Sequence, residues 1–232
     1  MSEPIYIHPA EARRRFREFA KSEIDGSNIA RGALLIALED YPQIDIDGYL
    51  QKLDELADRT SARVSAGEPA VFMLGHLQGE MFDIDGYHGD TTDYYDPRNA
   101  CLNEVIDRKA GLPITLSVVF LHVASRIGLE ATGVGLPGHY LVKVQCELNE
   151  IYVDPFRGGT TVTVREIAEL IAEMSGGKIA LKSEHLRGWG ARETLMRILA
   201  NLQGMYTRSG DQKKAMAAQE RMEILQIAGL SN

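Results

Sequence analysis

The apolar positions of the first ninety residues recur at the spacing of helices. HPAEARRRFREFAKSE begins with Pro9 in a first helical turn, where the missing N–H costs nothing. A dense apolar run, Ala33–Leu38, stops before Pro42. In a further segment the apolar residues recur at intervals of three and four residues, which places them on one buried stripe of a helix: Leu50, Leu53, Leu56, Ala57 and Val64. Residues 1–90 are therefore predicted to form a helical region packed on a core.

The pattern changes after Pro97. GLPITLSVVFLHVASRIGL is apolar nearly all round, so it predicts a central buried helix that starts at Pro113 and ends before Gly128. Three segments rich in Val, Tyr and Leu follow as strands, namely ATGVGL, HYLVKVQCE and EIYVDPF, the last two joined by Leu148 and Asn149. A buried helix followed by an antiparallel meander predicts an α+β core over residues 91–182.

The end of the chain is predicted to be helical again. Thr163 and Glu166 form a T-x-x-E capping box at the start of VREIAELIAEM. Two amphipathic segments come after RGWGAR, divided at Gly210 with Asp211 as the N-cap of the second. Residues 183–232 are thus expected to close the fold as a helical hairpin.

Charge and cysteine content narrow the classes of function. The formal charge of -8 disfavours non-specific nucleic-acid binding, because the phosphate backbone favours basic surfaces. No stretch approaches the roughly 18 apolar residues of a membrane span, and the first residues lack the apolar region of a signal peptide, so a cytoplasmic protein is expected. Cys101 and Cys146 lack CxxC spacing, which predicts two reduced thiols rather than a disulfide or a zinc site.

Acidic residues between positions 83 and 95 resemble part of a calcium loop. With Asp83 as the first position, Gly86 stands at the fourth position rather than the sixth, and no Glu follows at the twelfth. This segment is interpreted as a plain loop, and no metal or cofactor is expected. The following DYYDPRN is predicted to turn through side-chain bonds of Asp96 and Asn99 to nearby backbone, with Tyr94 and Tyr95 packing or lining a groove.

A His and an Asp fall on successive predicted strands. His139 precedes Asp154 by fifteen residues, and pairing through the predicted turn brings the two almost opposite each other on one face of the sheet. An imidazole can take a proton from a nucleophile while a carboxylate fixes its tautomer. The alternative is that both residues are ordinary strand-end residues.

The run from YYDPRNACLNEV to IYVDPFRGG resembles the bacterial transglutaminase-like family often labelled SirB, through the motifs DPRN, GLP-ITLS, G-x-PGH and Y-x-DPF-x-GG. That resemblance implies a papain-like α+β fold with a Cys at the N-terminus of a buried helix and His and Asp on successive strands. It assigns His139 as base and Asp154 as orienting carboxylate. The nucleophile would stand near Pro113 to Thr115, where this sequence has no cysteine.

Three residues remain as candidate nucleophiles. Thr115 and Ser117 are the nearest hydroxyls, but hydroxyls need strong activation. Cys101, 38 residues before His139, is the most plausible choice if the turn from Lys109 to Gly111 folds its segment beside the helix start. Otherwise Cys101 is a buried apolar filler.

Other features are interpreted as structural. Cys146 falls within a strand, and His122 lies on the buried helix as a hydrogen-bonded core residue rather than a ligand. The C-terminal hairpin resembles one tetratricopeptide repeat at Leu199, Leu202, Tyr206, Gly210 and Ala215. A single repeat must pack on the main domain and offers a groove to a peptide.

Two functions follow as hypotheses. In the first, the protein is an atypical or degenerate thiol hydrolase or acyltransferase acting on a peptide or amide. In the second, it is a non-catalytic protein-binding or regulatory module that uses the cleft and the hairpin. Both expect a peptide or protein partner, and the position of Cys101 relative to His139 discriminates them.

Overall fold

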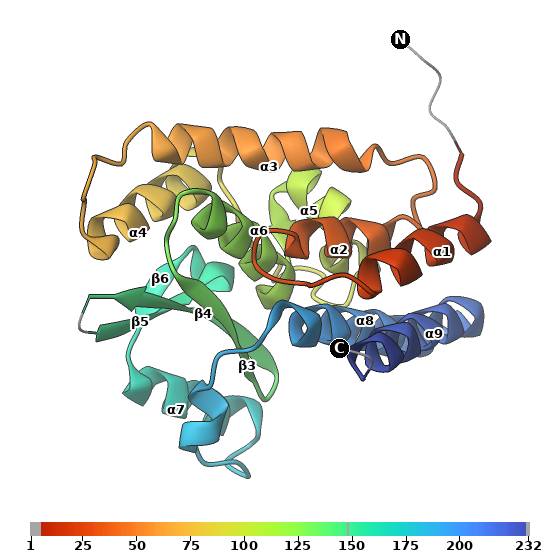
Figure 1. Cartoon of the computed structure of the whole chain (residues 1–232). Coiled ribbons are helices and arrows are strands. Elements are labelled where there is room, and N and C mark those ends of the chain that lie inside the picture. Colours follow the sequence, from red (N-terminus) through yellow and green to blue (C-terminus); the bar gives the residue numbers. More distant parts are fainter. Residues whose placement is uncertain (1–5, 148, 231–232) are drawn as a thin grey trace.

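The computed structural model describes residues 6–147 and 149–230, and it has the α+β architecture predicted from the sequence (Figure 1). Leu148, one of the two residues of the predicted strand turn, lies outside the described residues. The N-terminal helices are α1 (Pro9–Ala20), α2 (Ile29–Ala37), α3 (Ile46–Ser61) and α4 (Ala70–Gln78), and a π-helix (Gly79–Ile84) extends the last of them. The described part of the first ninety residues is thus helical up to Ile84, and a two-residue strand, His88–Gly89, follows.

The sheet has one strand more than the sequence indicated. Strands β3 (Ala131–Leu136), β4 (His139–Cys146), β5 (Asn149–Asp154) and β6 (Thr160–Val162) pair antiparallel in chain order. The extra strand has three residues, too short to show an alternating pattern. Two further short strands, β1 (His88–Gly89) and β2 (Ala110–Gly111), pair in parallel beside the helices α5 (Leu102–Arg108) and α6 (Pro113–Arg126).

Helix α6 is the centre of the molecule. Every residue from Pro113 to Ala124 is buried, Pro113 stands in the first turn and Gly128 has φ of 76°, all as the sequence predicted. The helix covers one face of the β3–β6 sheet, and α7 (Val164–Met174), started by the predicted Thr163–Glu166 capping box, covers the other face (Figure 1). The sheet is thus held between two helical layers.

The C-terminal helices form the predicted hairpin. Helices α8 (Ala191–Ser209) and α9 (Gln212–Gly229) meet at Gly210, whose φ is 81°, and Asp211 accepts a hydrogen bond from the Lys214 N–H. The hairpin packs against α1 and α2 (Figure 1). One cluster of buried apolar side chains runs from the N-terminal helices through α6 to both hairpin helices, so the three segments named from the sequence share a core.

Arg221 ties the hairpin to the N-terminal helices. Its side chain on α9 is 1% exposed, and it donates hydrogen bonds to the backbone carbonyls of Ile36 (2.5 Å) and Ala217 (3.1 Å). The Glu39 carboxylate lies 3.5 Å from the same guanidinium. A buried arginine is retained only with such partners, because an unpaired charge in the interior is costly. Among the described residues, no helix is both long and apolar enough to cross a membrane.

His122 is a hydrogen-bonded core residue, as predicted. It is 1% exposed, its Nε2 lies 2.9 Å from Asp54 Oδ1, and burial lowers its pKa below the ordinary histidine value. The unfolded chain therefore binds more protons than the folded one just below a pH of about 6.5, so stability falls as the pH drops through that value.

We expect this loss to be visible between pH 7 and pH 5.5. Urea unfolding of the wild type should show falling stability over that interval, whereas His122→Gln should remove most of the slope. Asp54, which also binds Arg126, remains ionised over this range because its pKa is lowered by its hydrogen bonds to His122 and Arg126. The matched control is His88→Gln, an exposed histidine; an equal change of slope in this control would refute the role of His122.

Candidate functional site

His139 and Asp154 form a buried hydrogen-bonded pair. His139 Nε2 lies 2.9 Å from Asp154 Oδ2, and the two residues are 7% and 0% exposed. Val142 pairs with Val153 in the sheet, and continuing that register makes Asp154 the diagonal neighbour of His139 rather than its directly opposite partner. Two long side chains still meet at that separation, so the strand pairing brings them together.

The carboxylate of Asp154 is fixed by the chain that follows it. Its Oδ1 accepts hydrogen bonds from the backbone N–H groups of Phe156 (3.0 Å) and Arg157 (3.3 Å) in a 3₁₀ turn, Pro155–Arg157. The Phe156 ring meets the imidazole edge to face, with centroids 6.0 Å apart. The DPF motif thus holds both the carboxylate and the ring of His139.

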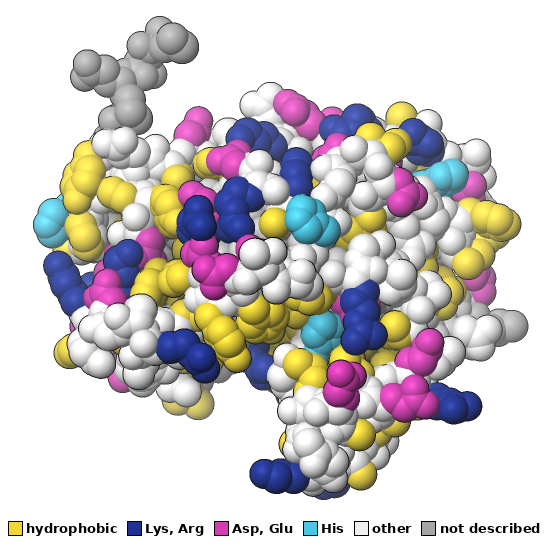
Figure 2. Space-filling view, turned by 180° about the vertical axis from the view of Figure 1, so that it is seen from behind, with side chains coloured by type: hydrophobic (Ala, Val, Ile, Leu, Met, Phe, Trp, Pro, Cys, Tyr) yellow, Lys and Arg dark blue, Asp and Glu magenta, His cyan; other side chains and the backbone are white. Residues whose placement is uncertain are grey.

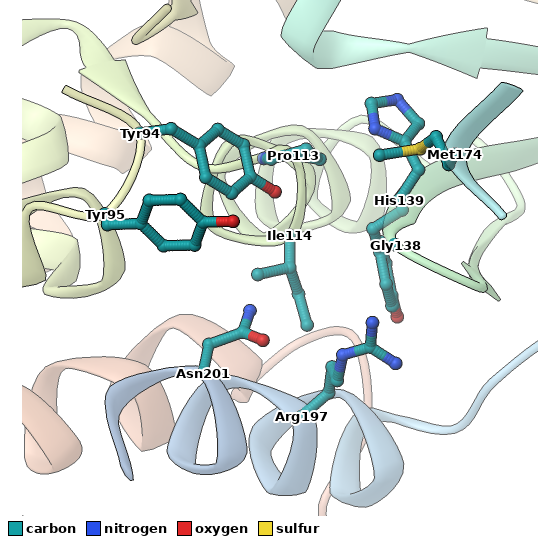
Figure 3. Close-up of a pocket in the computed structure, with 10 residues that line it drawn as sticks. Tyr94, Tyr95, Pro113, Ile114, Gly138, His139, Met174, Arg197 and Asn201 are labelled. Carbon is teal, nitrogen blue, oxygen red and sulfur yellow. The ribbon is translucent and has the colours of Figure 1, made fainter. Parts of the chain in front are cut away.

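His139 opens onto a pocket of about 360 Å³ at the start of α6 (Figure 3). Figure 3 shows Tyr94 and Tyr95 on one side, His139 and Met174 on the other, and Arg197 and Asn201 rising from α8. One ring nitrogen of His139 is bound to Asp154, and the other has no hydrogen-bond partner among the residues that the structure describes. Ten residues line the pocket: Tyr94, Tyr95, Pro113, Ile114, Gly138, His139, Tyr140, Met174, Arg197 and Asn201.

The hydroxyls nearest the start of α6 are already bonded within the fold. Thr115 Oγ1 donates to the Asn99 carbonyl at 2.6 Å, and Ser117 Oγ donates to the Pro113 carbonyl at 2.7 Å. Both residues are completely buried, and neither lines the pocket. Pro113 and Ile114 instead present apolar atoms at the place where the resemblance locates a nucleophile.

Cys101 does not join the pocket, contrary to the role suggested for it. Its segment does fold beside the helix start, since the Leu112 N–H donates to the Asn99 carbonyl. The residue is nevertheless 1% exposed, and the charges that act on its thiol include those of Asp40 and Arg221, on the side of the N-terminal helices and α9. Burial raises the pKa of this thiol, which makes it a core residue rather than an activated nucleophile.

The second cysteine is also buried. Cys146 is 4% exposed at the end of β4, and burial raises its pKa as well. This agrees with the structural role predicted for it. Neither thiol is bonded to His139 in the part of the chain that the structure covers.

The segment DYYDPRN, residues 93–99, is called the tyrosine loop, and a polar network holds it in place, as its sequence predicted. Asp96 accepts from the Arg98 N–H, and the buried Asn99 donates from Nδ2 to the Asp93 carbonyl. Arg108 adds bonds to both Asn99 and Asp90. The loop therefore presents its two tyrosines to the pocket on a fixed backbone.

The comparisons with known proteins agree with this fold. The family model of the transglutaminase-like superfamily matches residues 47–200, and the chain belongs to that superfamily. A UPF0162 protein of Xylella fastidiosa is 31% identical over 193 residues, which cover 82% of this chain and 69% of the relative. A UPF0162 protein of Pseudomonas aeruginosa is 29% identical over 204 residues, covering 86% and 73%.

The similarity extends beyond bacteria. F-box only protein 21 of Mus musculus is 27% identical over 199 residues, which cover 72% of this chain but 32% of that protein. No solved structure matches the chain. The relatives thus support the family and leave the specific role of the pocket to be argued from its residues.

Four lining residues were not singled out from the sequence: Tyr140, Met174, Arg197 and Asn201. Arg197 and Asn201 stand four apart on α8, a spacing that places them on one helix face. This spacing is the only sign of a shared site in the sequence, and its meaning is clear only from the structure, where the tyrosine loop lies opposite these two residues.

Proposed function

We propose that this protein is a peptide-binding module that keeps the transglutaminase-like pocket without its nucleophile. The observation that supports this most is the set of groups at the start of α6: Pro113 and Ile114 face the pocket where the family resemblance locates a thiol. Without a nucleophile, the His139–Asp154 pair orients a hydrogen-bonding ring in the pocket.

The pocket suits a peptide by its size and lining. A volume of about 360 Å³ lies within the range of small-ligand sites, and tyrosine rings beside polar groups are typical of peptide recognition. The unbonded nitrogen of His139 can accept from, or donate to, one group of the ligand. Amide or carbonyl groups of a peptide supply such partners.

Alkylation tests whether a thiol is active. We expect both cysteines to react slowly with iodoacetamide from pH 6 to pH 8, with no change in His139→Ala, because their pKa values are raised by burial. Mass spectrometry of the peptides containing each cysteine measures the rate, and unfolding in urea should expose both. Fast reaction of Cys101 at pH 6 that disappears in His139→Ala would contradict the proposal and support a thiol enzyme.

Binding is tested by filling the pocket. A displayed library of random twelve-residue peptides is selected on the wild-type chain, and the selected peptides are then measured on Asn201→Trp by fluorescence anisotropy. Asn201 is half-buried at the pocket wall, so an indole there should abolish binding with little strain on the core. Lys213→Trp, at an exposed position of α9, is the control and should bind normally. Selection of no peptide, or equal binding to Asn201→Trp, would overturn the proposal.

A further inference from the structure

A stripe of side chains along α8 connects the pocket to a second cavity. Arg197, Asn201, Gly204 and Arg208 stand at intervals of four, three and four residues, so they share one face of the helix. The second cavity measures about 220 Å³, and it shares Tyr94, Tyr95 and Asn201 with the first. The two cavities therefore form one groove between α8 and the tyrosine loop, in the hollow seen in Figure 2 between the C-terminal hairpin and the part that holds the sheet and α7.

The groove is basic in an acidic protein. The formal charge of the whole chain is -8, yet no Asp or Glu is among the residues that line either cavity. Arg197 and Arg208 form no ion pair with any residue that the structure describes. By contrast, Arg187, just before α8, is paired with Glu193. Both groove arginines thus keep their full donor capacity for a ligand.

The tyrosines hold one of these arginines in position. The guanidinium of Arg208 lies 4.0 Å from the centre of the Tyr95 ring, and Tyr94 meets Tyr95 edge to face with centroids 5.3 Å apart. Stacking limits the freedom of the arginine side chain and leaves its edge N–H groups open to a carboxylate. At the other end of the stripe, Arg197 is half-buried and its side chain rises from α8 beside the pocket (Figure 3).

We propose that the groove binds an extended peptide segment with two acidic side chains four or six residues apart, because an even spacing places both on the same face of an extended chain. Arg197 and Arg208 are eleven positions apart on α8, which is about 16 Å along the axis at the rise of about 1.5 Å per residue. An extended peptide advances about 3.3 Å per residue, so five residues cover that span. This inference rests on the proposed peptide-binding function and names the chemistry of its ligand.

The separation of the two charges selects this ligand over smaller anions. A single terminal carboxylate or a free phosphate reaches one guanidinium at a time across such a span. A segment with two carboxylates engages both arginines, and its intervening residues lie against Tyr94, Tyr95 and Asn201. Because no Asp or Glu lines the two cavities, a basic peptide would find no carboxylate to pair with there.

The test uses the peptides selected on the wild-type chain. We expect the enriched sequences to carry Asp or Glu pairs at spacings of four or six, and replacing both acids by their amides should abolish binding. Arg197→Gln and Arg208→Gln should each raise the dissociation constant of the peptide by about tenfold, in line with the loss of one charge-assisted hydrogen bond. Lys213→Gln, which removes the same charge at an exposed place on α9, should leave the constant unchanged.

The outcomes separate this inference from the function on which it rests. Two results would overturn the acidic-peptide inference and leave the proposed binding function standing. In the first, the selected peptides lose binding to Asn201→Trp but carry no acidic pair. In the second, they bind both arginine variants as they bind the wild type. Peptides whose single acid is the free C-terminus, and which lose binding on amidation, would also overturn it. If the selection enriches no peptide, the result contradicts the proposed function itself.

Discussion

Replacing Arg221 with methionine is expected to lower the free energy of unfolding by about 3 kcal/mol, because removing a buried charged donor leaves its buried carbonyl acceptors without that partner. The arginine is 1% exposed and bonds the carbonyls of Ile36 and Ala217. Without it, both carbonyls lose a donor, and the Glu39 carboxylate keeps only Arg13 of its two arginine neighbours. Equilibrium unfolding in urea, followed by circular dichroism, measures the change.

Methionine is chosen because it fills much of the arginine volume without its charge. Lys213→Met on the same helix removes an exposed positive charge and should change stability by less than about 0.5 kcal/mol. A loss below about 1 kcal/mol in Arg221→Met would show that packing, rather than the charge and its hydrogen bonds, holds the hairpin to α2.

Replacing Asp154 with alanine is expected to cost a similar amount, about 3 kcal/mol, because three donors lose one buried acceptor group. These donors are the His139 ring and the backbone N–H groups of Phe156 and Arg157. The same variant should release the His139 ring, so peptide binding should weaken as well. Urea unfolding and the anisotropy assay measure the two effects separately.

Asp154→Asn separates the structural role from the charge. Its amide oxygen can still accept from the backbone of the 3₁₀ turn, so we expect a smaller loss of stability than in the alanine variant. If Asp154→Ala unfolds like the wild type, the carboxylate is not the anchor of this turn. If Asp154→Asn binds peptides unchanged, the ring of His139 does not depend on the negative charge.

Local signals in the sequence predicted the helices around the site. Pro113 and Gly128 mark the two ends of α6, and Gly210 with Asp211 marks the hairpin turn; each acts through backbone conformation or capping within a few residues. The His139–Asp154 pair followed from one predicted turn between adjacent strands. Such features depend on short stretches of chain, and the sequence contains them in full.

The surroundings of Cys101 depend on distant parts of the chain. Asp40 comes from the turn that follows α2 and Arg221 from α9, and only tertiary packing brings both to the side of the core where the thiol lies. Spacing from His139 carries no information about that direction. The interpretation of Cys101 as an apolar filler, held open at first, is the one that its surroundings favour.

The stripe on α8 illustrates the same limit for binding residues. Arg197 and Arg208 occupy positions where an amphipathic helix ordinarily exposes charge to water. What distinguishes them is the tyrosine loop, a hundred residues earlier in the chain, which lies across the same face. Their significance therefore appears only when the two segments are seen together.

The bond from Arg221 to the Ile36 carbonyl joins positions 185 residues apart. During synthesis, α1 and α2 leave the ribosome long before α8 and α9, so the parts of their surfaces that pack on the hairpin stay uncovered until these two helices emerge. The hairpin therefore closes the described core only after the other described helices have been synthesised.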